Sequence, residues 1–255
     1  MKKSFLVLLL ILLTACNETE KSEAVNSSDF QYSGLLTTSA SFGSSGADLG
    51  IAGSVGITAN NYNDIKLSAN DQFNLITPDG QVMKGVNYQQ LGLLKSIFLC
   101  CTFSAGVHRE NLADFDIALA DNIWQFEFKR NGILEDSFTL TLAKPIVLDQ
   151  LDGFLMNDDG SITLSWQQEI LGGNIDIRLL SAESCDVSLY FPLSSADKMI
   201  TIKNEDVIQC KGLNAMVVDF MLGQPPQKKT TDILQVPLAI TISQLEQHIE
   251  LVLKE

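Results

Sequence analysis

The chain lacks the short motifs that mark common catalytic sites. It contains no GxSxG, HExxH, phosphate-binding loop or dinucleotide fingerprint, and it has only two histidines, His108 and His248. A serine or cysteine hydrolase needs a base beside its nucleophile, and histidine is the usual base. His108 follows Cys101 and Ser104 in a polar segment that is typical of an exposed loop. The sequence therefore predicts a protein that is not an enzyme.

Basic residues are scarce as well. The chain has 17 Lys and Arg residues against 31 Asp and Glu residues, which gives a formal net charge of −14. Its largest basic cluster is the pair Lys228 and Lys229. Nucleic-acid binding needs a concentrated basic surface that displaces counterions. We therefore expect no nucleic-acid partner, and an acidic surface that keeps the protein soluble.

Long apolar runs are also missing. A helix that crosses a bilayer needs about 20 apolar residues, and no segment after residue 15 approaches this. The apolar run at residues 5–13 is shorter; it follows Lys2 and Lys3 and leads through small residues to Cys16. This layout is typical of a secretory signal, so we expect residues 1–15 to be a signal peptide.

The end of this segment, Leu13-Thr14-Ala15-Cys16, resembles the bacterial lipobox. In that family the cysteine is acylated and becomes the first residue of the mature chain. The resemblance implies a lipid anchor on Cys16 and a membrane as partner, and several acyl chains on one residue anchor stably. Lipoproteins of the inner membrane often carry Asp at the next position, where this chain has Asn17. We therefore expect an outer-membrane lipoprotein with its body in the periplasm or at the cell surface.

The residues behind the anchor predict a flexible tether. Residues 16–29 contain no large apolar side chain except Val25, so they lack the means to build a core.

The rest of the chain shows a hydrophobic period of two. At residues 124–129, for example, Trp124, Phe126 and Phe128 alternate with polar residues. Such alternation marks strands with one face in a core and one in water. Turn signals such as Asn131-Gly132 separate the strands and predict hairpins. The same alternation recurs at residues 137–142, 161–166, 175–180 and 234–242. The predicted fold class is therefore all-β.

We predict two immunoglobulin-like β-sandwich domains in tandem. The boundary is placed at Lys144 and Pro145, because proline cannot donate to a strand ladder. Residues 30–143 form the predicted first domain and residues 145–242 the second. For the tail, residues 243–255, the spacing of apolar residues and a capping box at Ser243 and Glu246 favour a short helix. A terminal strand is the alternative.

The second predicted domain carries a family resemblance. Residues 160–166, GSITLSW, resemble the second strand of fibronectin type III and related immunoglobulin-like modules, in which a tryptophan enters the core. Residues 175–180 resemble the strand that follows. The mature chain as a whole is similar to Gram-negative envelope lipoproteins with a strand-rich first half and an immunoglobulin-like half that contains a cysteine pair. This likeness implies an architecture and no activity.

Export favours disulfides among the four cysteines that remain after Cys16. Four cysteines allow three pairings. We predict a bridge between Cys185 and Cys210, which share the second half. Cys100 and Cys101 are adjacent, and free thiols, a vicinal disulfide and bridges elsewhere all stay open for them.

Several aspartates are candidates for an acid–base or metal site. Asp114 and Asp116 would share one strand face, with Asp121 nearby, and could serve glycoside cleavage or calcium binding. A solvated strand face explains the same pattern. Asp158 and Asp159 suit a turn and lack the register of a calcium loop. We expect no metal and no cofactor.

Two loops are candidates for recognition, because loops carry function on β-scaffolds. They are residues 41–50, rich in glycine and serine, and residues 223–232, which contain Lys228 and Lys229 as predicted binding residues. The predicted function is a non-catalytic binding or structural assembly module of the cell envelope, with an envelope protein as partner. The alternatives are a lipoprotein that binds carbohydrate or a small ligand, and an enzyme with an unrecognised site.

Overall fold

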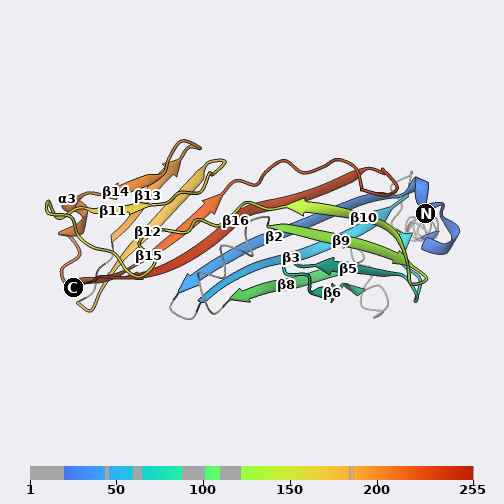
Figure 1. Cartoon of the computed structure of the whole chain (residues 1–255), viewed down its shortest axis with the longest axis horizontal. Helices are drawn as coiled ribbons and strands as arrows, with labels where there is room; N and C mark the ends of the chain where they lie inside the picture. Colours follow the sequence, from blue (N-terminus) through green and yellow to red (C-terminus); the bar gives the residue numbers. More distant parts are fainter. Residues whose placement is uncertain are drawn as a thin grey trace, which may run out of the picture.

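The structure is a computed structural model, and it describes residues 20–43, 46–59, 65–87, 101–109, 122–183, 185 and 187–254. These residues form an elongated, almost entirely β-stranded body, which confirms the predicted fold class (Figure 1). No helix within them is long and apolar enough to span a membrane. The predicted signal peptide lies outside the described residues, and so do the sites predicted or weighed at Cys16, Cys100, Asp114, Asp116 and Asp121.

One eight-stranded sheet runs the length of the body (Figure 1). In spatial order its strands are β13 (Val187–Leu193), β12 (Gly173–Ser181), β15 (Leu213–Leu222), β16 (Leu238–Val252), β2 (Gln31–Gly43), β3 (Gly46–Thr58), β8 (Cys101–Arg109) and β7 (Val86–Asn87). The strands of the second half of the chain thus continue the layer that the first half begins.

Strand β16 joins the two halves. Its partner on one side is β15, in antiparallel register, and on the other side β2, in parallel register. Leu245 lies opposite both Leu222 and Thr38, and Ile249 lies opposite both Val218 and Phe42. The two halves therefore share a strand and a sheet.

The short helix predicted for the tail is wrong, because residues 243–252 belong to strand β16. The reason is a bulge at Ser243 and Gln244, where the register with β2 shifts. The Ser243 hydroxyl accepts a hydrogen bond from the Thr38 N–H (3.3 Å) instead of capping a helix. The extra residue brings Ile242 and Leu245 to the same face of the sheet although they are three residues apart. That spacing imitates a helix.

A second, four-stranded sheet covers the first half. Its order is β10 (Ile133–Thr141), β9 (Ile123–Arg130), β5 (Gln72–Ile76) and β6 (Val82–Lys84). The β9–β10 hairpin turns at Asn131 and Gly132 with φ of 51° and 80°, which are the positive values that the Asn-Gly pair predicted. Tyr32 of the large sheet packs against Phe138 of β10, with ring centroids 5.8 Å apart. Aromatic rings therefore fill the space between the two layers.

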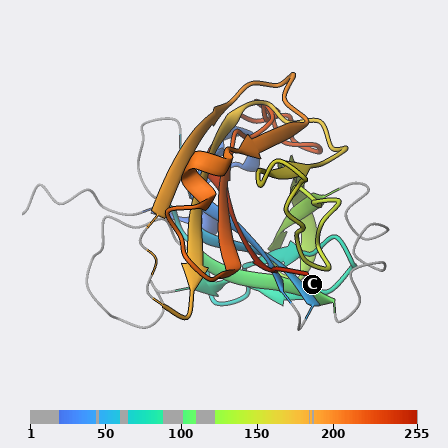
Figure 2. The same cartoon turned by 90° about the vertical axis from the view of Figure 1, so that its left-hand side faces the viewer.

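The second half is an immunoglobulin-like sandwich. Two short strands, β11 (Ile162–Ser165) and β14 (Met199–Ile202), pair opposite the end of the large sheet. The successive strands β11 and β12 lie in different sheets, as the resemblance to fibronectin type III implies. Trp166 is fully buried and meets Phe220 edge to face at 5.9 Å. A short helix, α3 (Asn204–Val207), lies at this end of the body (Figure 2).

The predicted disulfide between Cys185 and Cys210 is confirmed. It joins the turn between β12 and β13 to the segment between α3 and β15, so it ties one end of the edge hairpin to the start of β15.

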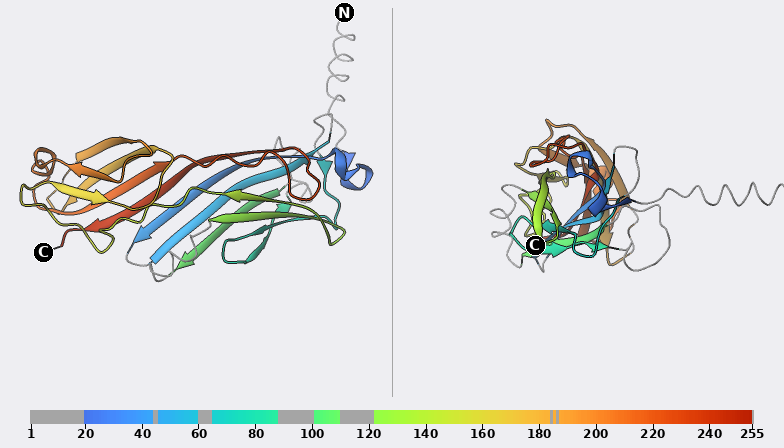
Figure 3. Two further views of the ribbon diagram at one scale, coloured as in Figure 1. Left: turned by 45° about the horizontal axis from the view of Figure 1, so that its top comes forward. Right: turned by 90° about the vertical axis from the view of Figure 1, so that its right-hand side faces the viewer.

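The described part of the predicted tether, residues 20–29, differs from a flexible linker. Strand β1 (Glu20–Lys21) pairs with β4 (Ile65–Lys66), and two 3-10 turns follow, η1 (Ser22–Ala24) and η2 (Ser27–Asp29). Ser22 is fully buried and donates a hydrogen bond to Asp71. These residues lie at the end of the body opposite the C-terminus (Figure 3).

The predicted boundary at Lys144 and Pro145 follows the end of β10, where the chain passes into the second half. Here Gln247 of β16, which is 2% exposed, accepts from the Ile146 N–H (2.7 Å) and donates to the Ile146 carbonyl (2.5 Å). The crossing segment is therefore tied to the shared strand.

We expect Leu245→Ala to lower the free energy of unfolding by about 2–5 kcal/mol, because Leu245 is fully buried in the shared part of β16. The two tryptophans report the two halves separately, Trp124 the first and Trp166 the second. In urea titrations of single-tryptophan variants, both halves should unfold in one coincident transition, which Leu245→Ala shifts for both. Val252→Ala, on an exposed side chain of the same strand, is the control. Two well-separated transitions would contradict the shared-strand account.

Candidate functional site

The candidate site is built around the connection between β15 and β16. We call this connection, residues 223–237, the strap. It runs back along the first half beside β16 (Figure 1), and it contains the whole of the predicted recognition loop at residues 223–232. It lies between β10, an edge strand of the four-stranded sheet, and the start of β16.

Two glutamine side chains fasten one end of the strap to the end of β10. Gln227 accepts a hydrogen bond from the Thr141 N–H (3.1 Å) and donates to the Thr141 carbonyl (2.7 Å). Gln224 accepts from the Ala143 N–H (2.8 Å) and donates to the Thr38 hydroxyl (2.8 Å). These amides supply the partners that a neighbouring strand would give, so they satisfy the edge of the sheet.

A buried carboxylate holds the other end of the strap. Asp136, which is 1% exposed, accepts hydrogen bonds through Oδ1 from the N–H groups of Ser137 (2.9 Å), Ile233 (3.2 Å) and Leu234 (3.2 Å). Burial raises the pKa of Tyr32, and the nearby charge of Asp136 raises it further. The phenol of Tyr32 therefore stays protonated beside the carboxylate.

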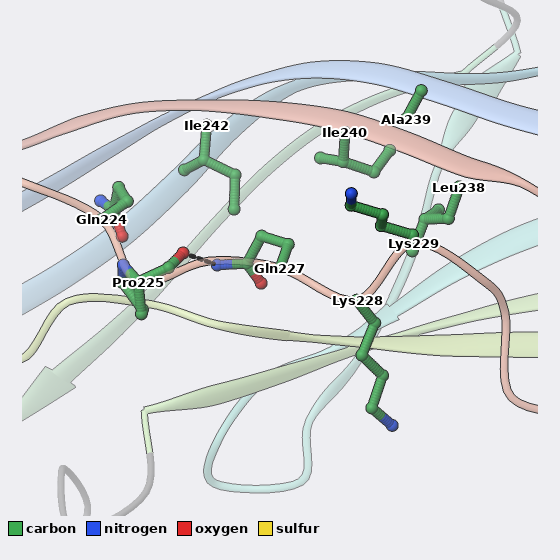
Figure 4. Close-up of a pocket in the computed structure, with 9 residues that line it drawn as sticks. All are labelled: Gln224, Pro225, Gln227, Lys228, Lys229, Leu238, Ala239, Ile240 and Ile242. Atoms are coloured by element: carbon green, nitrogen blue, oxygen red, sulfur yellow. Dashed lines mark hydrogen bonds between the residues drawn. The ribbon is translucent and has the colours of Figure 1, made fainter.

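A pocket of about 350 Å³ lies between the strap and the start of β16 (Figure 4). Strap side chains form one wall and aliphatic side chains of β16 form the other. Ile240 lies over Gly34, where an added Cβ would come within 2.7 Å of the Ile240 Cδ1 atom. The lining residues are Gln224, Pro225, Gln227, Lys228, Lys229, Leu238, Ala239, Ile240 and Ile242.

The structure separates the two predicted binding lysines. The Lys228 ammonium pairs with Asp232 at 2.9 Å and points away from the pocket (Figure 4). The Lys229 side chain extends toward Ile240 (Figure 4). Within the described part of the chain Lys229 makes no ion pair, so its charge is available at the pocket.

A second pocket of about 530 Å³ lies where the two halves meet. Its lining is largely aliphatic, with Lys144 and Glu169 as charged members. Pro225 lines both pockets, so the strap separates two hollows on one side of the body. The lining residues are Leu142, Ala143, Lys144, Gln168, Glu169, Ile170, Leu171, Leu222, Gly223 and Pro225.

Comparisons with known proteins add little. No protein-family model and no curated protein matches the chain. Among solved structures, a two-domain fibronectin type-III segment from chicken tenascin is similar over 81% of this chain and 92% of its own, with 9% identity and a TM-score of 0.24. A likeness this weak supports no inference about function.

Two other segments considered from the sequence, residues 41–50 and the surroundings of His108, lie largely on strands of the large sheet. In the range 41–50, residues 41–43 and 46–50 are strand ends of β2 and β3. His108 lies on β8 and not in a loop. Because a strand rises about 3.3 Å per residue, Ser104 and Cys101 lie about 13 and 23 Å from His108 along it. The backbone positions of both residues are therefore well separated from that of His108 along the strand.

Sequence reasoning missed a charged cluster on the outer face of the large sheet. His248 of β16 donates from Nδ1 to Asp219 of β15 (2.7 Å), and its Nε2 lies 3.4 Å from Glu250. Arg178 of β12 reaches Asp219 at 3.5 Å. The hydrogen bond to Asp219 is the main cause that raises the pKa of His248. Strands far apart in the sequence bring these residues together, so no local pattern predicts the cluster.

Metal binding finds no support in the described residues, which contain no group of three suitable ligands. Asp159 accepts hydrogen bonds from the N–H (2.9 Å) and hydroxyl (2.6 Å) of Ser161, as a turn residue does. The Ser161 hydroxyl is the main cause that lowers the pKa of Asp159.

We expect Asp136→Ala to loosen the strap, because three backbone N–H groups lose their acceptor. The free energy of unfolding should fall by about 3 kcal/mol. Limited trypsin digestion should cut faster after Lys228 and Lys229. Asp136→Asn keeps an oxygen acceptor and is the matched control with a smaller effect. Unchanged digestion of Asp136→Ala would refute the anchoring role.

We expect His248→Gln to destabilise the protein at pH 5.5 and hardly at pH 9. The folded pKa of His248 is raised, so its contribution is complete below the unfolded value of about 6.5 and is lost as the pH rises through the folded value. The cluster is exposed, so the loss should be no more than about 1 kcal/mol. Urea unfolding at both pH values measures it, with Thr241→Ala on the same strand as control. An equal loss at both pH values would contradict this account.

Proposed function

We propose that the protein is a non-catalytic binding module, anchored by lipid on Cys16 to the outer membrane of the cell envelope. The observation that carries the proposal is the pocket beside the strap. Its walls are fastened by hydrogen bonds from Gln224, Gln227 and Asp136, so the hollow is preformed. Five of its nine lining residues are apolar and four are polar, and ligand sites combine apolar walls with polar groups that orient the ligand.

The chemistry of the lining favours binding over catalysis. The nine residues around this pocket supply amides, ammonium groups and aliphatic chains, and none is a carboxylate, imidazole, hydroxyl or thiol. A lysine amine can act as a nucleophile or base, but the lining offers no acidic or imidazole partner for it, so these groups are suited to holding and orienting a ligand.

The anchor and the fold together suggest how the body sits. The described body begins at Glu20, four residues after Cys16. Four residues span at most about 14 Å. Lipidation at Cys16 would therefore hold the first half close to the membrane surface, in the periplasm or at the cell surface.

One observation favours the second candidate, a structural role with an envelope protein as partner. Strand β13 is the outermost strand at one end of the large sheet, and β12 is its only strand partner in the described residues. Its Tyr190 side chain is 64% exposed. An open strand edge can accept a strand from another protein. Pro192 in the same strand limits how far such pairing could extend.

We expect Cys16→Ser to release the protein from membranes into the soluble fraction, because the acyl anchor is lost. Membrane fractionation and the intact mass of the protein measure this, with Cys100→Ser as a control that leaves the lipobox intact. A variant that remains on the membrane with the same mass as the unsubstituted protein, apart from the substitution itself, would overturn the anchor.

The binding role is tested with the full-length Cys16→Ser protein, immobilised and exposed to an envelope extract. Mass spectrometry then identifies what is retained, in comparison with Ile242→Glu, which places a charge in the pocket. A small molecule lost from the variant would support the binding module. A single retained protein would support the assembly role, and retention of neither would refute both.

A further inference from the structure

We propose that the pocket beside the strap takes an anionic amphiphile, with its carboxylate or phosphate at the Lys229 ammonium and its aliphatic chain along Ile240 and Ile242. The inference rests on the proposed binding function and names the class of ligand for that site. Three features of the pocket lead to this inference: its charge, its apolar wall and the hydrogen bonds that its glutamine side chains already make.

The charge of the pocket is opposite to that of the protein. Acidic residues outnumber basic ones by 31 to 17 in the chain, yet the pocket lining contains two lysines and no carboxylate. Asp232 neutralises Lys228 from outside the lining, at 2.9 Å, and so one net positive charge remains, on Lys229. An exposed ion pair with a ligand contributes up to about 1 kcal/mol, which corresponds to roughly fivefold in affinity.

The apolar wall continues the core of the first half. Ile240 and Ile242 project from the core-facing side of β16, but both are only half-buried. Leu238, which lines the same pocket, is by comparison 6% exposed. The strap bridges the gap without filling it. An aliphatic chain that lies along these side chains would remove apolar surface from water, which favours its binding.

The amides of the strap argue against a peptide. Gln224 uses its oxygen and its nitrogen on Ala143 and Thr38. Gln227 uses both ends on Thr141, and its nitrogen also donates to the Pro225 carbonyl (2.7 Å). Both N–H groups of Gln227 and one of the two on Gln224 are therefore already used, so a peptide backbone would find few free amide donors there and would be desolvated with little compensation. The same reasoning disfavours a sugar, whose hydroxyls would face isoleucine side chains. An aliphatic chain has no polar group that needs a hydrogen-bond partner.

Binding is measured with the full-length Cys16→Ser protein, because it needs no detergent that would compete for the pocket. The probe is dansylaminoundecanoate, followed by fluorescence, with its methyl ester as the neutral analogue. Unlabelled dodecanoate and dodecyl phosphate serve as competitors. Saturable binding at one site per chain is expected, with the carboxylate preferred over the ester.

Lys229→Gln should weaken binding of the carboxylate probe about fivefold and leave the ester unchanged. Ile242→Asn should weaken both probes. Lys211→Gln, an exposed lysine of the second half, is the charge-matched control. Lys228→Gln removes the same charge one residue away; a loss equal to that of Lys229→Gln would overturn the assignment to Lys229. Circular dichroism and the melting temperature establish that each variant is folded.

Three results would overturn the inference. The first is no binding of either probe by folded protein. The second is equal affinity for carboxylate and ester that Lys229→Gln does not change. The third is binding only to phosphatidylglycerol vesicles, or only to a peptide with a free C-terminal carboxylate, each of which would assign the site to another class of partner. If the envelope extract still yields a different small molecule, the binding function stands and only the ligand class is wrong.

Discussion

The pairing of β16 with strands on both of its sides is the interaction on which the rest of the structure depends. Residues 245–249 lie between β15 and β2, so backbone hydrogen bonds connect the last strand of the chain both to its own half and to the first half. Moving one half against the other would break these bonds in the middle of a sheet. The partners Leu245 and Thr38 are about 200 residues apart, so the sheet is complete only when a very long loop has closed.

The shared strand also explains the strap. Leu222 ends β15 opposite Leu245, whereas β16 begins seven residues earlier, at Leu238. The chain must therefore travel back about 23 Å before β16 can start. The 15 residues of the strap are more than this path requires. Hydrogen bonds at Asp136, Gln224 and Gln227 hold this longer segment against the body. The hollow beside Ile240 is the space that this fastening leaves between the strap and the sheet.

The local pattern of the sequence predicts part of the site and misses its organisation. The pair Lys228 and Lys229 is visible as the largest basic cluster. Which of the two faces a pocket depends on Asp232, on the course of the strap and on the position of β16. The glutamines that fasten the strap have no sequence signature, because their partners Thr141 and Ala143 are more than 80 residues away. The local sequence does not predict the cluster around His248 for the same reason, because its residues lie on three different strands, β12, β15 and β16.

The sequence by itself determined the all-β class, the Asn131-Gly132 hairpin and the burial of Trp124 and Trp166. These features follow from period-two alternation and from turn residues with positive φ, which act over short stretches of chain. Four cysteines allow three pairings, and the structure shows the predicted bridge between Cys185 and Cys210. Only the tertiary structure decided that the tail is a strand, that the two halves share one sheet, and that residues 20–29 pack on the body. Each of these depends on backbone groups that find partners far along the chain, and a bulge such as that at Ser243 can make a strand look helical.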